Sequence, residues 1–340
     1  MNTSHDTWLA QVKEEALDPQ LPIIDAHHHL WEYPDSQYVV EDYLADTRSG
    51  HNIVQSVFVE CLSMHRKNGP DEMKPVGETE YVRGLTDASD AKSDHRTRVA
   101  TGIVGFADLA LGESIEPVLD SHISSGRGRF RGIRHASGWD TSNDVRNSHS
   151  RPPPQLLSST QFRKGFALLG QYNLSFDAWL YHPQIPELIE LARAFPDTTI
   201  VLDHIGGPLG IGPYAGKRDS IFEQWKRDIE QLAKCHNVFV KLGGFAMKIN
   251  GFGWHTLDKP PTSEQLATAA APYYHFCIEQ FGVNRCMFES NFPVEKASCS
   301  YGVLWNAFKR VADGFSNSER RELFHDTAAR VYRLPVVRNP

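Results

Sequence analysis

The sequence contains few cysteines and no paired cysteine motif. Its five cysteines are spread singly over 340 residues, and none belongs to a Cys-x-x-Cys pair. The number is odd and the spacing is irregular, so a disulfide framework is not expected. We interpret them as free thiols in a reducing cytosol.

Long apolar runs and dense basic runs are also missing. No apolar run approaches the roughly 20 residues that a membrane span needs, and the polar first 19 residues lack the apolar segment of a signal peptide. The net charge of −7, without a basic cluster, argues against nucleic acid and anionic membranes as partners. We expect a cytoplasmic protein that acts on a small-molecule substrate. Whether it forms a homo-oligomer stays open.

The sequence contains a repeated strand–helix pattern. After a first strand around Ile23 and Ile24, buried strands are predicted at 53–59, 98–106, 130–134, 174–180, 199–202, 238–242 and 285–288. Helical spacing follows each of them. Parallel strands need crossover helices, and eight such units close into a barrel. We therefore predict an α/β fold, a (β/α)8 TIM barrel over residues 21–335, preceded by an N-terminal extension at 1–20.

Polar residues gather at the predicted carboxyl ends of these strands. In a barrel of this kind, the active site lies where those ends meet. The residues found there are His27, His29, Glu60, His135, His182, His204, Lys241, Glu289 and Asn291. A random scatter would not favour one end of the strands, so this pattern predicts a functional site.

The segment Ile24-Asp25-Ala26-His27-His28-His29 gives the sharpest signal. Side chains alternate along a strand, so His27 and His29 share one face and His28 points away. Two neighbouring imidazoles at the end of a buried strand can hold a divalent ion or the anionic part of a substrate. The alternative is an exposed histidine-rich turn.

Four stretches resemble the amidohydrolase superfamily, and within it the sugar-lactonase and pyrone-dicarboxylate-lactonase branch. They are Ile24-Asp25-Ala26-His27-His28-His29-Leu30-Trp31, Phe130-Arg131-Gly132-Ile133-Arg134, the run from Phe195-Pro196 to Asp203-His204-Ile205-Gly206, and Met287-Phe288-Glu289-Ser290-Asn291-Phe292-Pro293. The resemblance implies a barrel enzyme that opens small lactones with water. It also implies that His27, His29 and His204 are the candidate ligands of a divalent metal, zinc first among them. Metal-free catalysis, with the histidines binding the substrate, is the alternative.

One position departs from the pattern of the family. The resemblance places a strand-eight aspartate, the expected base, at Asn291, whose amide cannot accept a proton at neutral pH. Glu289 stands two residues earlier and faces the same side of the strand. We hypothesise that Glu289 takes over the role of the carboxylate, with a pKa raised by confinement. Alternatively, Glu289 is a structural acid paired with Lys241 or an arginine.

The remaining candidates are predicted substrate contacts. A guanidinium group binds carboxylates with two hydrogen bonds, so Arg134 suits an acidic substrate unless it forms a surface salt bridge. Glu60, His135 and Trp179 are predicted to line the pocket, and His182 is a candidate catalytic residue at the rim. Asp203 is expected to face away from the site, and His149, in the long loop 137–154, is expected to be solvated.

The predicted activity is therefore hydrolysis of a small lactone, from sugar-acid or aromatic catabolism. Water attacks the ester carbonyl, a carboxylate removes its proton, and His204, His182 or a metal polarises the carbonyl oxygen. Two other functions stay open: a decarboxylase or hydratase lyase, and a catalytically silent binding protein.

Overall fold

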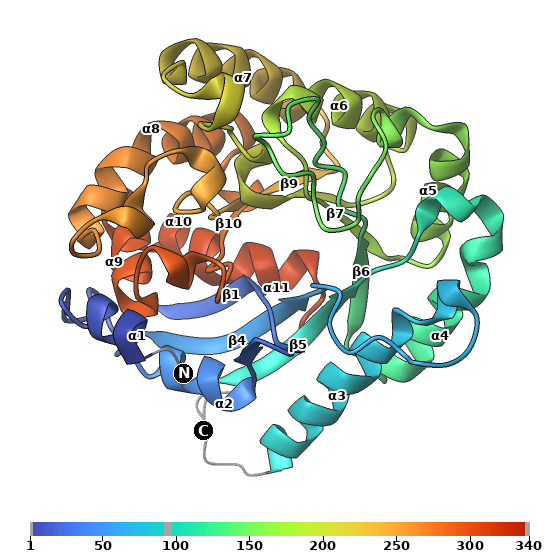
Figure 1. Ribbon diagram of the computed structural model, residues 1–340, viewed down its shortest axis with the longest axis horizontal. Helices are drawn as coiled ribbons and strands as arrows, with labels where there is room; N and C mark the ends of the chain where they lie inside the picture. Colours follow the sequence, from blue (N-terminus) through green and yellow to red (C-terminus); the bar gives the residue numbers. More distant parts are fainter. Residues whose placement is uncertain (1–2, 92–96, 337–340) are drawn as a thin grey trace.

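The chain folds into a ring of parallel strands surrounded by helices, as the computed structural model in Figure 1 shows for residues 3–91 and 97–336. Neighbours in the sheet follow the order of the chain, and each pairing is parallel. The strands are β1 (Pro22–His28), β4 (Asn52–Val59), β5 (Arg98–Gly105), β6 (Phe130–Arg134), β7 (Ser175–Ala178), β8 (Ile200–Leu202), β9 (Val238–Leu242) and β10 (Cys286–Phe288). The predicted (β/α)8 TIM barrel is confirmed.

The ring closes between β1 and the segment that follows β10. Asn291 N donates to His27 O at 2.8 Å, and His29 N donates to Phe292 O at 2.8 Å. His28 and Phe292 also form a parallel bridge. The histidine segment and the turn after the last strand are therefore neighbours, although more than 260 residues of chain separate them.

Helices cover the outside of the ring because each has an apolar face to bury. They are α2 (Val40–Thr47), α3 (Val76–Ala91), α4 (Glu116–Gly126), α5 (Thr160–Gln171), α6 (Ile185–Ala194), α7 (Arg218–Ala233), α8 (Ser263–Phe281) and α9 (Tyr301–Val311). On α5, the rings of Phe162 and Phe166 pack against Phe176 of β7 at 5.9 and 5.2 Å between centroids. Each such fully buried aromatic side chain contributes roughly 2–3 kcal/mol.

Asp25 of β1 joins the two ends of the ring through its side chain. Its carboxylate accepts hydrogen bonds from Ser290 N at 2.8 Å, Ser290 Oγ at 2.6 Å, Tyr43 OH at 3.0 Å and Tyr301 OH at 2.9 Å. Burial raises the pKa of Asp25 to about 6, and these hydrogen bonds oppose the rise. Asp25 therefore connects β1, α2, α9 and the turn after β10.

Two further features lie at the N-terminal side of the chain. Helix α1 (Thr3–Leu9) and a hairpin of β2 (Trp31–Tyr33) and β3 (Ser36–Tyr38) form where no element was predicted. Lys309 Nζ of α9 donates to the carbonyls of Leu17 and Asp18 at 2.8 and 2.9 Å, which fixes the end of the extension to the barrel. In the described part of the chain, no helix is long and apolar enough to cross a membrane.

Candidate active site

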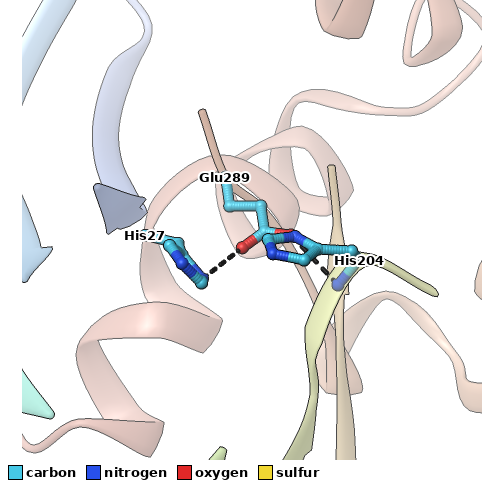
Figure 2. Close-up of side chains that lie close together, drawn as sticks. All are labelled: His27, His204 and Glu289. Carbon is cyan, nitrogen blue, oxygen red and sulfur yellow. Dashed lines mark hydrogen bonds and ion pairs between the residues drawn. The ribbon is translucent and has the colours of Figure 1, made fainter. Parts of the chain in front are cut away.

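Three buried side chains from distant parts of the chain meet at the carboxyl ends of the strands (Figure 2). His27 belongs to β1, His204 follows β8, and Glu289 follows β10. His204 Nδ1 lies 2.5 Å from Glu289 Oε1, and His204 N donates to the same oxygen at 3.2 Å. His27 Nδ1 lies 2.9 Å from Glu289 Oε2. One ligand atom from each residue lies within 4.8 Å of the others, so this cluster has the donors of a metal site.

A left-handed turn aims His204 at the centre of the ring. β8 ends at Leu202, and His204 and Ile205 then adopt φ values of 53° and 51°. Such values are uncommon without glycine and are frequent at functional sites. A Cβ atom on Gly244 would stand 2.4 Å from His204 Cβ, so only glycine leaves room for this side chain. The turn and Gly244 together set the position of the imidazole.

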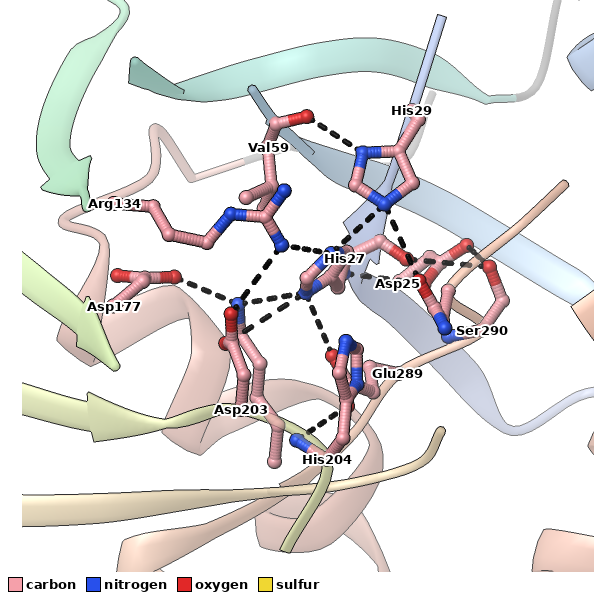
Figure 3. A network of polar contacts seen from close by, with 12 residues as sticks. Asp25, His27, His29, Val59, Arg134, Asp177, Asp203, His204, Glu289 and Ser290 are labelled. Atoms are coloured by element: carbon pink, nitrogen blue, oxygen red, sulfur yellow. Dashed lines mark hydrogen bonds and ion pairs between the residues drawn. The ribbon is translucent and has the colours of Figure 1, made fainter. Parts of the chain in front are cut away.

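The same turn brings Asp203 inward, and the expectation that it faces away is therefore wrong. Strand alternation stops where β8 ends, so adjacent residues no longer point to opposite sides. Asp203 is fully buried, with Oδ1 at 2.9 Å from Lys241 Nζ. Lys241 Nζ also lies 2.7 Å from Asp177 Oδ2 and 3.2 Å from His27 Nδ1. Figure 3 shows the side chains of Asp177, Asp203 and His27 close together. This layer supports His27 from within the barrel.

The carboxylates of Asp177 and Asp203 keep the ammonium group of Lys241 protonated. Burial alone would lower the pKa of Lys241, but Asp177 and Asp203 together raise it above its usual value. Tyr332 OH donates to Asp177 Oδ2 at 2.7 Å, which completes the polar layer. Sequence reasoning gave little weight to Lys241 and Asp177, although both lie in predicted strands.

The pKa of Glu289 is lowered, and the expectation that confinement raises it is wrong. Burial of the carboxylate works in the expected direction, but its close contacts with the imidazoles of His204 and His27 outweigh burial and lower the pKa to about 2. Glu289 is therefore ionised at neutral pH. A carboxylate with this pKa is a weak base, but it is a strong acceptor for the Nδ1–H of His204.

His29 presents a free lone pair to its neighbours. Its Nδ1 lies 2.8 Å from Val59 O, and a carbonyl can only accept, so the proton is assigned to Nδ1. The Nε2 atom then faces His27 Nε2 and Asn291 Oδ1, each at 3.2 Å. Burial, together with the nearby charge of Arg134, lowers the pKa of His29 to about 3, and burial likewise lowers that of His27. Both imidazoles are neutral, as metal ligands must be.

His28 points away from this cluster, as the strand alternation predicts. Its Nε2 lies 2.9 Å from Ser56 Oγ, and its ring stacks on Tyr43 with centroids 4.1 Å apart. Burial lowers the pKa of His28 to about 3. It is therefore a packed, neutral side chain of the barrel wall.

Arg134 and Glu60 form a buried ion pair beside the histidines. Arg134 Nε donates to Glu60 Oε1 at 2.6 Å, and Arg134 Nη1 lies 3.4 Å from His27 Nε2 and 3.6 Å from Asp203 Oδ2. His149 Nε2 lies 2.8 Å from the same Glu60 oxygen, so the expectation that His149 is merely solvated is wrong. The length of its loop was the one sequence signal that pointed to it.

Trp179, His135 and His182 lie around this centre. The ring of Trp179 stands edge-on to His204, with centroids 4.8 Å apart. His135 Nδ1 accepts from Leu109 N at 3.3 Å, and His182 Nδ1 accepts from Leu209 N at 3.2 Å. Burial lowers the pKa of each of these two histidines to about 4.

Within the described residues, neither His135 nor His182 forms a hydrogen bond or ion pair with His27, His204 or Glu289. The ring of His135 packs against Phe106, at 5.1 Å between centroids, and the ring of His182 stands edge-on to Tyr214 at 5.2 Å. The structure thus brings His27, His29, His204, Glu289, Asn291, Arg134, Glu60 and Trp179 together, and leaves His135 and His182 at the edge.

Fold and site together define a TIM-barrel protein with a histidine–carboxylate centre at the carboxyl ends of its strands, where enzymes of this fold have their active sites. A model of the amidohydrolase family matches residues 24–334. The chain belongs to the amidohydrolase family.

Individual proteins are similar over nearly the whole chain. An uncharacterized protein, y4mH, of Sinorhizobium fredii is 35% identical, over 92% of this chain and 99% of its own. An L-fucono-1,5-lactonase of Burkholderia multivorans is 26% identical, over 92% of this chain and 96% of its own. A crystal structure of a Burkholderia multivorans amidohydrolase with bound zinc superposes with a TM-score of 0.69 at 23% identity, and covers 92% of this chain and 99% of its own. At this level of identity, the similarity to the zinc-bound structure shows that the two chains share a fold.

Proposed function

We propose that this amidohydrolase opens the ring of a small lactone by adding water to its ester carbonyl. The contact between His204 Nδ1 and Glu289 Oε1 carries the proposal. It orients His204 as a base, and a base is needed because Asn291 occupies the position where the resemblance predicts the catalytic aspartate. Similarity to the L-fucono-1,5-lactonase supports the choice of a lactone.

Glu289 orients His204 and does not itself take the proton. Because the ionised carboxylate accepts from Nδ1–H, Nε2 is the nitrogen of His204 that can take up a proton. That nitrogen removes a proton from the attacking water. Glu289 stabilises the positive imidazolium that results, as a buried carboxylate does in hydrolases with a histidine base. The bond between the carbonyl carbon and the ring oxygen then breaks, and the imidazolium returns the proton to that ring oxygen, which gives a hydroxy acid and regenerates His204. This assignment differs from the expectation from the sequence, in which Glu289 was the base and His204 polarised the carbonyl. In the proposed mechanism, Glu289 is a positioning residue and His204 is the base.

We assign Arg134 to the stabilisation of the negative charge that forms during the attack. Its Nη1 group is 3.4 Å from His27 Nε2, and its guanidinium stays charged at any relevant pH. As water adds, the carbonyl oxygen of the lactone becomes negative, and fixed donors that face this oxygen lower the barrier. Arg134 therefore supplies part of the stabilisation. Trp179, edge-on to His204, limits the access of bulk water to the imidazole.

The site also fits zinc. Its residues offer neutral imidazole nitrogens, which are zinc donors, and the amide oxygen of Asn291, which is a weaker ligand than a carboxylate. The 3.2 Å separations of His29 Nε2 from His27 Nε2 and Asn291 Oδ1 match neighbouring ligands of one ion, which are about 3.3 Å apart for bonds of about 2.1 Å. The 2.5 Å contact between His204 and Glu289 is shorter and is a hydrogen bond. His27, His29 and Asn291 are therefore the residues that would hold the ion, and zinc held there would polarise a carbonyl or activate water.

A lactone panel tests the function. The purified protein is added to weakly buffered solutions of five- and six-membered lactones with a pH indicator, because ring opening releases a proton. Saturable acid release supports the proposal. If no lactone is opened and carbon dioxide is released from hydroxylated aromatic acids, the protein is a decarboxylase. If neither reaction occurs, the binding-protein alternative replaces the enzyme.

A further inference from the structure

Glu60 has one carboxylate oxygen that the proposed reaction leaves without a role. The side chain is fully buried at the end of β4, and its Oε1 is occupied by Arg134 Nε at 2.6 Å and His149 Nε2 at 2.8 Å. Its Oε2 is also buried, and no residue in the described ranges donates a hydrogen bond to it. A buried polar atom without a partner is costly. Its presence beside a reaction centre points to a donor group on a ligand.

The carboxylate of Glu60 is an acceptor only. Burial would raise the pKa of Glu60, but the charges and hydrogen bonds of Arg134 and His149 outweigh burial and hold it below its usual value. The ionised group cannot donate, so it can bind hydroxyl or amino groups and repels another carboxylate.

Glu60 stands between the reacting centre and the solvent. On the inner side, Arg134 connects it to His27 Nε2. On the outer side, the side chain of His149 is 25% exposed. A lactone whose carbonyl is held at His204 could extend its substituents toward Glu60, on the side of His149.

The charges around the centre disfavour an anionic substrate. Two cations, Arg134 and Lys241, stand among four carboxylates: Glu60, Asp177, Asp203 and Glu289. These six side chains alone sum to −2, so they leave no positive excess for a substrate carboxylate. Arg134, which the sequence suggested as a partner for a substrate carboxylate, already faces Glu60 and Asp203.

We propose that Glu60 Oε2 accepts a hydrogen bond from a substrate hydroxyl group, and that the protein therefore selects uncharged, hydroxylated lactones over carboxylated ones. Arg134 and His149 hold Glu60 in place. The proposal rests on the proposed lactonase reaction and narrows its substrate class.

Three lactones with the same five-membered ring test this selection. They are D-galactono-1,4-lactone, which is hydroxylated and uncharged; γ-butyrolactone, which has no hydroxyl; and 5-oxotetrahydrofuran-2-carboxylate, which is anionic. The wild type is expected to show the highest kcat/KM on the first. Glu60→Gln is expected to lose about 10- to 1,000-fold on the hydroxylated lactone and a clearly smaller factor on γ-butyrolactone, which has no hydroxyl to bind. It is expected to gain on the anionic lactone, because Arg134 loses its counter-charge.

Glu78→Gln is the matched control. Glu78 is a second buried glutamate, which accepts from Cys61 N at 3.0 Å and Ser63 N at 2.8 Å. Burial and the charge of Glu60 raise the pKa of Glu78 to about 8, so it carries a proton at neutral pH and glutamine resembles it closely. This variant is expected to keep the ratio among the three lactones.

The outcomes separate the two proposals. If Glu60→Gln lowers kcat/KM on all three lactones by one common factor, its role is structural and the inference is overturned. If the wild type prefers the carboxylated lactone, the inference is overturned although the lactonase function stands. If the wild type opens none of a full lactone panel, the function itself fails. Should Glu60→Gln not fold, His149→Ala is expected to reduce the preference for the hydroxylated lactone by a smaller factor, and an unchanged preference counts against the inference.

Discussion

Glu289 Oε1 lies 2.5 Å from His204 Nδ1, and this contact joins the ends of two strands that 85 residues of chain separate. The carboxylate stays ionised because its imidazole partners outweigh its burial. An ionised glutamate that accepts from the Nδ1–H of a histidine leaves Nε2 as the nitrogen that can take up a proton, and this is the base of the proposed mechanism. In the proposed mechanism, His204 and Glu289 replace the proton acceptor that asparagine cannot provide at position 291.

Replacing Glu289 with glutamine should lower kcat for lactone hydrolysis by roughly 10²- to 10⁴-fold, because the amide neither fixes the tautomer of His204 nor stabilises its charged form. The fold should persist, since glutamine keeps the shape of the side chain. Initial rates with circular dichroism as a fold check measure this. Turnover within about twofold of the wild type would refute the role of Glu289.

The low pKa of Glu289 predicts a loss of stability in acid. Its folded pKa of about 2 lies below the usual 4.5, so its contribution to the free energy of unfolding is complete above about pH 5 and falls as the pH drops toward 2. From pH 6 to pH 3 the wild type should lose about 2 kcal/mol more than Glu289→Gln. Urea unfolding at both pH values measures the difference. Equal losses in the two proteins would show that Glu289 is not ionised in this way.

Zinc binding should depend on His29 and not on His28. We expect about one zinc ion per chain, and His29→Asn should weaken zinc binding at least tenfold, since it removes a donor nitrogen. His28→Asn is the control, because His28 faces Ser56 and Tyr43. Competition with a zinc-binding dye and elemental analysis give the affinity and the content. Similar affinities in both variants would place the ion elsewhere.

Asp25→Ala should destabilise the ring where its two ends meet. The change leaves the hydroxyl groups of Ser290, Tyr43 and Tyr301 without their shared acceptor, at a cost of at least about 3 kcal/mol. Tyr43→Phe removes one of these donors and should cost about 1 kcal/mol. Thermal unfolding of both variants tests this order. A smaller effect for Asp25→Ala than for Tyr43→Phe would contradict it.

The barrel could be predicted because its signals are local. Strands at 130–134 and 238–242 were predicted with the observed bounds, since short apolar runs between polar turns define them. The alternation within β1 correctly separated His28 from its neighbours. These features depend only on neighbouring residues in the sequence.

The chemistry of the site could not be predicted because it depends on contacts between distant strands. The pKa of Glu289 is set by His204 and His27, and the direction of Asp203 by a left-handed turn that alternation does not anticipate. His149 reaches Glu60 from a loop without a regular pattern. The partners of Glu289, Asp203 and His149 become apparent only when the strands are arranged in the closed barrel.

A double-mutant cycle tests the central claim most directly. The kcat values of Glu289→Gln, His204→Asn and the double variant are compared on the best lactone substrate. If the two residues act as one base, the double variant is no slower than the slower single variant, within about threefold. If the two losses multiply, Glu289 and His204 act independently and the proposed mechanism is wrong.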